Sequence, residues 1–361
     1  MSSRPAPVIA LLAFSALLLG AAPLLPAAEV LTTDALPPTR LRFGSLTVYS
    51  ENDRYFAGTD QHYTNGFKLA LLSTELKNFT DDPVPRPIQA VARSLDRAVA
   101  PGRDCKLGFA LGQNIYTPTA IHTSAPQPYD RPYAAWLYAG LAFQTYLAPR
   151  VFASGWRAIG QLDTFEVNAG LVGPGALGRQ IQNGFHDLIH RPHADGWANQ
   201  IHNEAGLTLG FERKYRVATT AARTGWGADL IGHGGVTLGN IFTYANAGTE
   251  VRAGWRLPAD FGTDLIRPSS DSNSRRRPAW SMFGFAAFDA RGVARDVTLD
   301  GNTFRSSPRV KREPFVTDFL SGGAIGTQHW QFTYSQAVRS REFAGQPKRS
   351  VFGSISATFY Y

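Results

Sequence analysis

The sequence contains one cysteine, Cys105, in 361 residues. No intramolecular disulfide can form, so an exported chain of this kind must be stabilised by packing and backbone pairing alone. Beyond residue 25 there is no apolar run of the roughly 20 residues that a membrane-spanning helix requires. No linker rich in proline, serine or glycine divides the chain either. These absences favour one domain, spanning residues 29–361 and built on a closed sheet.

Signatures of several enzyme classes are also absent. The sequence has no G-x-S-x-G elbow, no Walker loop and no dinucleotide-binding fingerprint, so a serine nucleophile is not indicated. The net charge of +8 would attract anionic surfaces such as phosphorylated lipid headgroups or nucleic acid. Because no nucleic-acid-binding motif accompanies the charge, no nucleic-acid partner is predicted. No obligate protein partner is evident.

The first 28 residues are typical of a secretory signal peptide. Residues 9–25 are apolar, Arg4 precedes them, and small residues follow at 26–28. The alternative is a single transmembrane anchor, but Pro23 helps to shorten the apolar core below the length of a spanning helix. We therefore expect cleavage near Ala28 and export of the remaining chain.

The exported part has apolar residues with a period of two, the pattern of β-strands with two different faces. One example has Val251, Ala253, Trp255 and Leu257 on one face, and Glu250, Arg252, Gly254 and Arg256 on the other. In a membrane barrel the apolar face meets lipid and the polar face lines the lumen, which accepts charged side chains. In a soluble sandwich, the alternative, the apolar faces need a partner sheet. Residues 359–361 read F-Y-Y, which suits a final barrel strand.

The expected fold class is therefore all-β: a transmembrane antiparallel β-barrel of about 12 strands in the Gram-negative outer membrane, with short helices in its loops. The strands are expected at 41–52, 64–74, 106–114, 133–147, 160–171, 205–217, 228–242, 248–258, 279–290, 314–325, 328–339 and 350–361. An even strand number puts both ends of the barrel sheet on the periplasmic side, so the connections after odd strands lie at the outer rim. These outer connections are 53–63, 115–132 and 172–204. The connection 75–105 is periplasmic and contains a short amphipathic helix.

The first outer connection carries a cluster of oxygen ligands suited to calcium. A carboxylate, side-chain oxygens and backbone carbonyls near a glycine are hard ligands of the kind that this ion takes. The cluster comprises Asn52, Asp53, Tyr63, Thr64, Asn65 and Gly66. The alternative is turn chemistry, in which Asn and Asp cap the strand ends. The spacing of an EF-hand is absent.

The second outer connection contains D-R-P-Y from Asp130 to Tyr133. Asp130 and Arg131 can form an ion pair at the rim. Alternatively, the guanidinium of Arg131 can bind a phosphate through two parallel hydrogen bonds. Of the two, the structural ion pair is the simpler interpretation.

The third outer connection offers a general base. Residues 180–189 can form a short helix with His186 on one face, and histidine suits proton transfer near neutral pH. Water activated by His186, with calcium and backbone amides stabilising the oxyanion, would hydrolyse an ester without a protein nucleophile. A competing interpretation is a zinc site, because H-D-L-I-H places His186 and His190 one helical turn apart.

Six motifs in a fixed order resemble one family. They are E-N-D, Y-T-N-G, G-Q-N-I-Y-T-P, D-R-P-Y-A-A-W, G-P-G-A-L-G and Q-N-G-F-H followed by G-W-A-N-Q-I-H-N-E. Together they are similar to the lipid A deacylase family of the outer membrane, the LpxR-like proteins. The resemblance implies a twelve-stranded barrel with a calcium-dependent site at the outer rim, which removes the 3'-O-linked acyloxyacyl group of lipid A in lipopolysaccharide. Outer-membrane lipids would surround it. A non-enzymatic, porin-like barrel is the alternative.

The resemblance also implies roles for particular residues. His186 matches the family's base, Asn52 and Asp53 match its Asn-Asp pair, and Thr64 matches its functional threonine. Asp53 and the Thr64–Gly66 segment, including Gly66, would bind Ca2+, and Asn52 would help to hold the oxyanion. One position departs from the family, because Pro192 stands where a glutamate follows the histidine by six positions. Its role would then pass to Asp187, Asp195 or Glu204, or would be dispensable.

Overall fold

The structure is a computed structural model and describes residues 40–55, 62–98, 103–147, 150–151, 157–221, 225–263, 265–266 and 277–361. The predicted signal peptide, residues 1–28, lies outside these ranges. No helix in the described part is long and apolar enough to cross a membrane.

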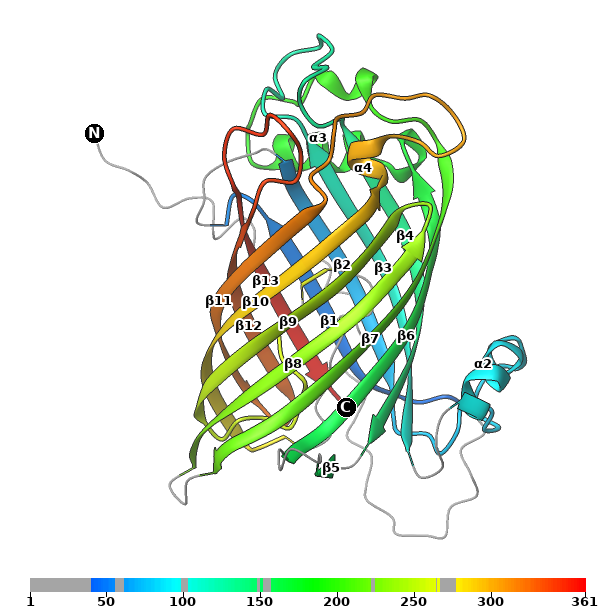
Figure 1. The fold of residues 1–361 in the computed structure, drawn as a ribbon, viewed down its shortest axis with the longest axis vertical. Coiled ribbons are helices and arrows are strands. Elements are labelled where there is room, and N and C mark those ends of the chain that lie inside the picture. The colour runs from blue at the N-terminus through cyan, green and yellow to red at the C-terminus, as the bar shows by residue number, and fades with distance from the viewer. Residues whose placement is uncertain are drawn as a thin grey trace.

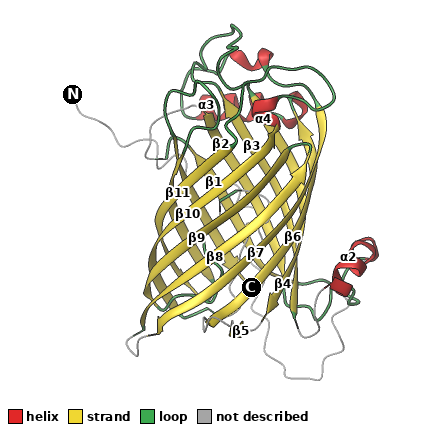
Figure 2. Ribbon diagram, viewed as in Figure 1, coloured by secondary structure: helices red, strands yellow, loops and turns green. Residues whose placement is uncertain are grey.

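Twelve long strands form one antiparallel sheet that closes into a barrel (Figures 1 and 2). They are β1 (Phe43–Asn52), β2 (His62–Ser73), β3 (Asp104–Thr117), β4 (Ala134–Leu147), β6 (Arg157–Val172), β7 (Glu204–Ala221), β8 (Trp226–Gly239), β9 (Phe242–Trp255), β10 (Trp280–Asp296), β11 (Phe315–Thr327), β12 (Trp330–Arg339) and β13 (Ser350–Tyr360). A two-residue strand, β5 (Arg150–Val151), pairs with β6. Neighbours in sequence are neighbours in the sheet, and β1 pairs with β13 to close the wall. The predicted fold class is confirmed, and the sandwich is excluded because the strands of the described residues all belong to one closed sheet.

The main error in the predicted strands falls between β8 and β9. The turn between these two strands was predicted at residues 243–247. It lies instead at 240–241, and β9 begins at Phe242. The residues assigned to a turn are paired on both sides, with Asn246 opposite Gly235 and Arg291. Small and polar residues suggested a turn there, yet in a barrel they simply face the lumen, where Asn246 is buried. β10 also runs six residues further than expected.

Short helices lie at both ends of the barrel (Figure 2). The helices are α2 (Arg86–Ala98), η1 (Pro174–Ala176), α3 (Gly178–Leu188), η2 (Gly196–Asn199) and α4 (Val297–Asp300). α2 is the amphipathic helix predicted in the connection 75–105, and it lies at the end of the barrel where the C-terminus is found. α3 and α4 lie at the opposite end, with the long connections. This opposite end is the outer rim of the barrel.

The two faces of the wall have opposite chemistry, as the period of two predicts. In β9 the side chain of Val251 is 52% exposed on the outer face, while Glu250 and Arg252 are buried in the lumen. Ion pairs on the inner side join neighbouring strands, except that Arg103 precedes β3 and pairs with Asp163 in β6. They link Asp163 with Arg103 and Arg213, Asp229 with Arg216 and Arg252, and Asp318 with Arg291 and Arg339. The three carboxylates, Asp163, Asp229 and Asp318, are buried and each is paired, as burial of a charge requires.

The connection between β9 and β10 enters the lumen. Phe261, Leu265 and Ile266 are buried there, and Asp260 forms an ion pair with Arg252. The backbone N–H of Ile266 donates a hydrogen bond to Oε1 of Glu51 at 2.8 Å. The connection therefore reaches the inner face of β1, directly behind the first outer connection, and it fills lumen space that an open channel would require.

Candidate functional site

The outer ends of β1 and β2 bring two predicted calcium ligands together. Asn52 pairs with Asn65 in the β1–β2 register, so Asp53 and Thr64 occupy adjacent positions where the hairpin leaves the sheet. Both are buried, at 2% and 4% exposure. The sequence alone could not bring them together, because about ten residues separate them along the chain.

Thr64 is in contact with a residue that the sequence analysis missed. Its Oγ1 lies 2.6 Å from Oγ1 of Thr117, which is fully buried at the end of β3. A β-bulge between Tyr63 and Asn65 turns Thr64 toward this neighbour. Thr117 follows Ile115 on the outer face of the wall, whereas Tyr116 between them faces the lumen core. The hydroxyl pair therefore lies on the outer side of the barrel. The only sequence signal for Thr117 was its place in G-Q-N-I-Y-T-P.

Asn52 makes a turn contact with one end of its side-chain amide and has a hydrogen-bond donor at the other end. Its Oδ1 accepts a hydrogen bond from the backbone N–H of Arg54 at 2.8 Å, which is the expected turn chemistry. With Oδ1 engaged, the group that Asn52 can offer a substrate is its Nδ2 donor. A donor is what a developing oxyanion requires.

Gly66 lies inside β2, opposite Glu51 and Asn114. A Cβ at this position would collide with the hydroxyl of Tyr63 in the lumen. That hydroxyl donates to Oε2 of Glu51 at 2.6 Å and accepts from Nδ2 of Asn114 at 3.0 Å. Close packing on the inner face therefore explains this glycine, and a role in binding calcium through its carbonyl stays a prediction.

α3 packs on the outer face of β3 and β4. Its buried residues are Gly178, Gln182 and His186, which recur every four positions and form one stripe along the helix. A Cβ on Gly178 would lie 2.6 Å from Cβ of Ala135 in β4, so the helix lies directly on the wall. Nε1 of Trp197 in η2 donates to Oε1 of Gln182 at 2.8 Å. The stripe that ends in His186 therefore faces the barrel.

His186 is 3% exposed, and its Nδ1 lies 2.6 Å from the carbonyl oxygen of Pro192. A carbonyl can only accept, so this contact places the proton on Nδ1 and leaves the lone pair on Nε2. A histidine in this tautomer is prepared to accept a proton through Nε2.

The segment that carries Pro192 is fixed to α3 by a second side chain. Asn183 accepts a hydrogen bond from the N–H of Ala194 at 2.9 Å and donates one to its carbonyl at 3.3 Å. The N–H of Arg191 donates to the carbonyl of His186 at 2.8 Å. These bonds hold the Pro192 carbonyl against the imidazole.

The candidate replacements for the missing glutamate are all placed elsewhere. Asp187 is exposed and pairs with His193, and Asp195 is exposed. The carboxylate of Glu204 accepts hydrogen bonds from the N–H groups of Thr303 and Phe304. At position 192, the group that contacts the His186 imidazole is therefore the backbone carbonyl of Pro192 and not a side chain.

The zinc interpretation is not supported by the geometry. α3 ends at Leu188, and His190 has a φ of 54° and is exposed, whereas His186 is buried. The two histidines therefore do not form a pair on one helical face. Over the described ranges, no three His, Cys, Asp or Glu residues are grouped to hold a metal ion.

Arg131 pairs with a different carboxylate from the one expected. Asp130 instead accepts from the backbone N–H groups of Thr119 and Arg131. The guanidinium of Arg131 is fully buried, lies 3.2 Å from Oε2 of Glu342 and covers the ring of Tyr116. Burial tends to raise the pKa of Glu342, but Arg131 and Arg339 hold that pKa below its ordinary value of 4.5. Arg131 therefore ties the second outer connection to the loop after β12.

The comparison with known proteins agrees with this arrangement. A family model described as outer membrane protein LpxR matches residues 11–361. The chain belongs to the LpxR family. Its fold is similar to a solved structure of LpxR from Salmonella typhimurium, with a TM-score of 0.66, 20% identity, and coverage of 88% of this chain and 100% of that one. No curated protein matches the sequence. The LpxR-family barrel therefore spans the outer membrane.

Solved outer-membrane barrels outside the LpxR family are much less similar. The translocator domain of the autotransporter NalP from Neisseria meningitidis has a TM-score of 0.36 at 11% identity, over 90% of each chain. The COG4313 channel from Pseudomonas putida F1 has a TM-score of 0.35 at 12% identity, over 92% of this chain and 100% of that one. Neither likeness carries weight for function.

The residues at the β1–β2 rim fit the calcium ion that the LpxR resemblance implies. Asp53 supplies a buried carboxylate, and Thr64 and Thr117 supply two hydroxyl oxygens 2.6 Å apart. All are hard oxygen donors, and the remaining positions of the about six to eight that calcium takes would come from carbonyls and water. These residues therefore suit calcium in two respects: their donor atoms are oxygens, and they are buried.

Proposed function

We propose that this protein is an outer-membrane, calcium-dependent esterase that hydrolyses the 3'-O-linked acyloxyacyl chain of lipid A. The observation that carries the proposal is the orientation of His186 by the Pro192 carbonyl at 2.6 Å, on a helix whose buried stripe faces the barrel wall. Asn52, Asp53 and Thr64 lie at the outer end of the same wall. Membership of the LpxR family supports the choice of substrate.

Each side chain has a defined task in the reaction. Nε2 of His186 accepts a proton from water as the water oxygen attacks the ester carbonyl, and Nδ2 of Asn52 donates to the carbonyl oxygen. Asp53 and Thr64 would hold calcium, which when bound supplies further stabilisation of negative charge. His186 then returns its proton to the sugar oxygen as the C–O bond breaks. The products are a free fatty acid and a sugar hydroxyl.

The outer surface around α3 suits an acyl chain. Ile181 and Leu188 on the helix are each 49% exposed, and Leu111 on β3 is 54% exposed. Such apolar side chains are stable where they face lipid. A substrate whose acyl chains lie in the same membrane layer would therefore reach His186 without leaving the bilayer.

The test is the mass of lipid A after incubation with purified protein in outer-membrane vesicles. We expect loss of one acyloxyacyl group, prevented by a calcium chelator and restored by added calcium. His186→Ala should lower the rate by about 10³-fold, within the range for loss of a general base. His190→Ala is the matched control, because this exposed histidine follows the helix and should keep activity. Unchanged lipid A after incubation with the folded parent protein and calcium would refute the proposal.

A further inference from the structure

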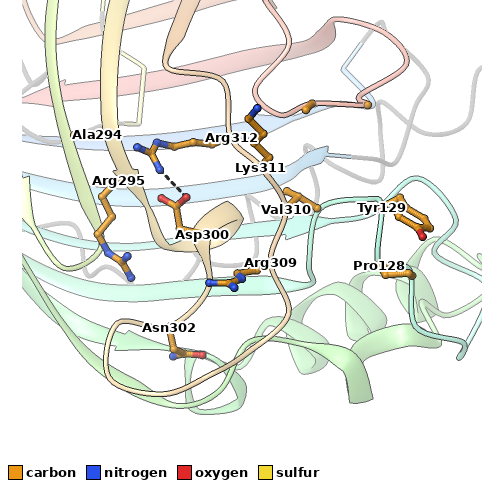
Figure 3. Close-up of a pocket in the computed structure, with 12 residues that line it drawn as sticks. Pro128, Tyr129, Ala294, Arg295, Asp300, Asn302, Arg309, Val310, Lys311 and Arg312 are labelled. Atoms are coloured by element: carbon orange, nitrogen blue, oxygen red, sulfur yellow. Dashed lines mark hydrogen bonds and ion pairs between the residues drawn. The ribbon is translucent and has the colours of Figure 1, made fainter.

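A second feature of the outer rim is a large basic cleft (Figure 3). It has a volume of about 850 Å³ and is formed by three connections: the one after β10, the one after β12 and the one after β3. Four cationic side chains and one carboxylate line it. They are Arg295, Arg309, Lys311, Arg312 and Asp300. The cleft therefore has a net charge of +3.

Two of the four cations have structural partners. Arg312 forms an ion pair with Asp300 at 2.7 Å, as Figure 3 shows. Arg295 donates to the carbonyls of Asn240 and Gly301. Their charges remain in the cleft, but their donors are engaged in holding the connection after β10 in place.

The other two cations are available to a ligand. Arg309 and Lys311 are exposed, and within the described ranges their side chains make no hydrogen bond or ion pair. Their backbone is nevertheless fixed. The N–H of Val310 donates to the carbonyl of Leu299, and the N–H of Ala344 donates to the carbonyl of Lys311, both at 2.8 Å. Two cations are thus presented from a backbone that neighbouring connections hold in position.

An aromatic ring completes the cleft. Tyr129 is 89% exposed at its edge, where the phenol lies open to solvent (Figure 3). A flat apolar ring next to cationic donors is suited to a sugar ring that carries an anionic substituent, because the ring packs on the sugar while the cations bind the oxyanion. The same connection continues to Tyr133, which packs against Trp197 at a centroid distance of 5.0 Å beside α3. The cleft and the candidate site therefore share one connection.

We propose that this cleft binds an anionic saccharide, through Arg309 and Lys311 on its phosphate or carboxylate groups and through Tyr129 on a sugar ring. The assignment goes beyond the proposed function, because binding here involves none of the residues assigned to ester hydrolysis. The outer rim, where the cleft opens, is the side of the barrel on which such saccharides are attached to membrane lipid.

Binding can be measured separately from hydrolysis. The full chain with His186→Ala, in neutral detergent with a calcium chelator, is titrated with labelled lipopolysaccharide. Arg309→Gln combined with Lys311→Gln should weaken binding about tenfold, because two charge-assisted contacts are lost. Arg305→Gln combined with Lys348→Gln is the matched control: it removes two exposed cations from the same connections, but neither lines the cleft. Equal affinities of the two double variants would overturn the proposal.

Two modified ligands identify the anionic group. Lipopolysaccharide stripped of phosphate, and lipopolysaccharide with its sugar carboxylates reduced, are each titrated against the cleft variant and the control. If the tenfold difference disappears with the first ligand, phosphate is recognised; if it disappears with the second, carboxylate is recognised. If it persists with both modifications combined, the cleft does not bind oxyanions. Thermal unfolding of both variants must match that of the parent, so that a folding defect is not scored as lost binding.

Discussion

Where β1, β2 and β3 reach the outer rim, the inner and outer faces of the barrel wall carry different chemistry. The residues responsible, such as Tyr63 and Thr64, are neighbours in the sequence. On the inner face Glu51, Tyr63 and Asn114 bond to one another and to the connection that fills the lumen. On the outer face Thr64 and Thr117 hold two hydroxyls 2.6 Å apart. Successive side chains of a strand point to opposite sides of the sheet. A structural hydrogen-bond network therefore lies on the inner face, and the candidate site lies directly opposite it on the outer face. Inner substitutions should therefore change stability, and outer ones should change activity.

Within the comparison of the two faces, the largest effect is expected from the adjacent pair Tyr63 and Thr64. Thr64→Val keeps the shape but removes the oxygen, and we expect deacylation to fall about 100-fold. The lost hydrogen bond to Thr117 should also lower the free energy of unfolding by about 1 kcal/mol. Tyr63→Phe should lose a similar amount of stability, about 1 kcal/mol, because a buried hydrogen bond to Glu51 is lost, but it should keep activity. Both are measured on protein folded into vesicles, by lipid A mass and by urea unfolding. The reverse pattern would show that the two faces are not functionally separate.

Gly66→Ala tests the inner face by packing. The new methyl group collides with the Tyr63 hydroxyl, so we expect a loss of about 1–3 kcal/mol in urea unfolding. Combining it with Tyr63→Phe should cost less than the sum of the two single changes, because the colliding oxygen is gone. An additive double variant would contradict this explanation.

Thr117→Val should have a smaller effect on the outer face. The substitution removes the hydroxyl that contacts Thr64 but leaves Asp53 and Thr64 in place, and we expect activity to fall about tenfold, a change of about 1.4 kcal/mol in activation free energy. Thr117→Ser restores the oxygen and should restore activity. More calcium should be needed for half-maximal rate in the valine variant than in the serine variant. Equal calcium requirements would place Thr117 outside the calcium site.

The smallest effect is expected at Asn183, which positions the segment carrying Pro192. Asn183→Ala removes both hydrogen bonds to Ala194, and we expect a loss of about threefold in kcat with KM unchanged. Asn199→Ala, which removes a hydrogen bond to the carbonyl of Ser124, is the control and should leave kcat unchanged.

Local patterns were enough to predict most of the fold. A period of two in hydrophobicity follows directly from the geometry of a strand between lipid and lumen, so all twelve strands could be predicted, and most of their ends to within four residues. The break between β8 and β9 was misplaced because Asn246 and the small residues around it signal a turn by propensity, but in β9 they are held by partners on both sides. Pairing with distant strands overrides local preference there.

Sequence alone determined the barrel, its outer connections and the candidates His186, Asp53 and Thr64, because residue type and motif order suffice for these. Only the tertiary structure decided which polar residues meet. Arg131 pairs with Glu342, 211 positions away, and Thr64 meets Thr117, 53 positions away. The contact of His186 with the Pro192 carbonyl is hidden from sequence for another reason: every residue has a carbonyl, and only the fold shows which one accepts a hydrogen bond.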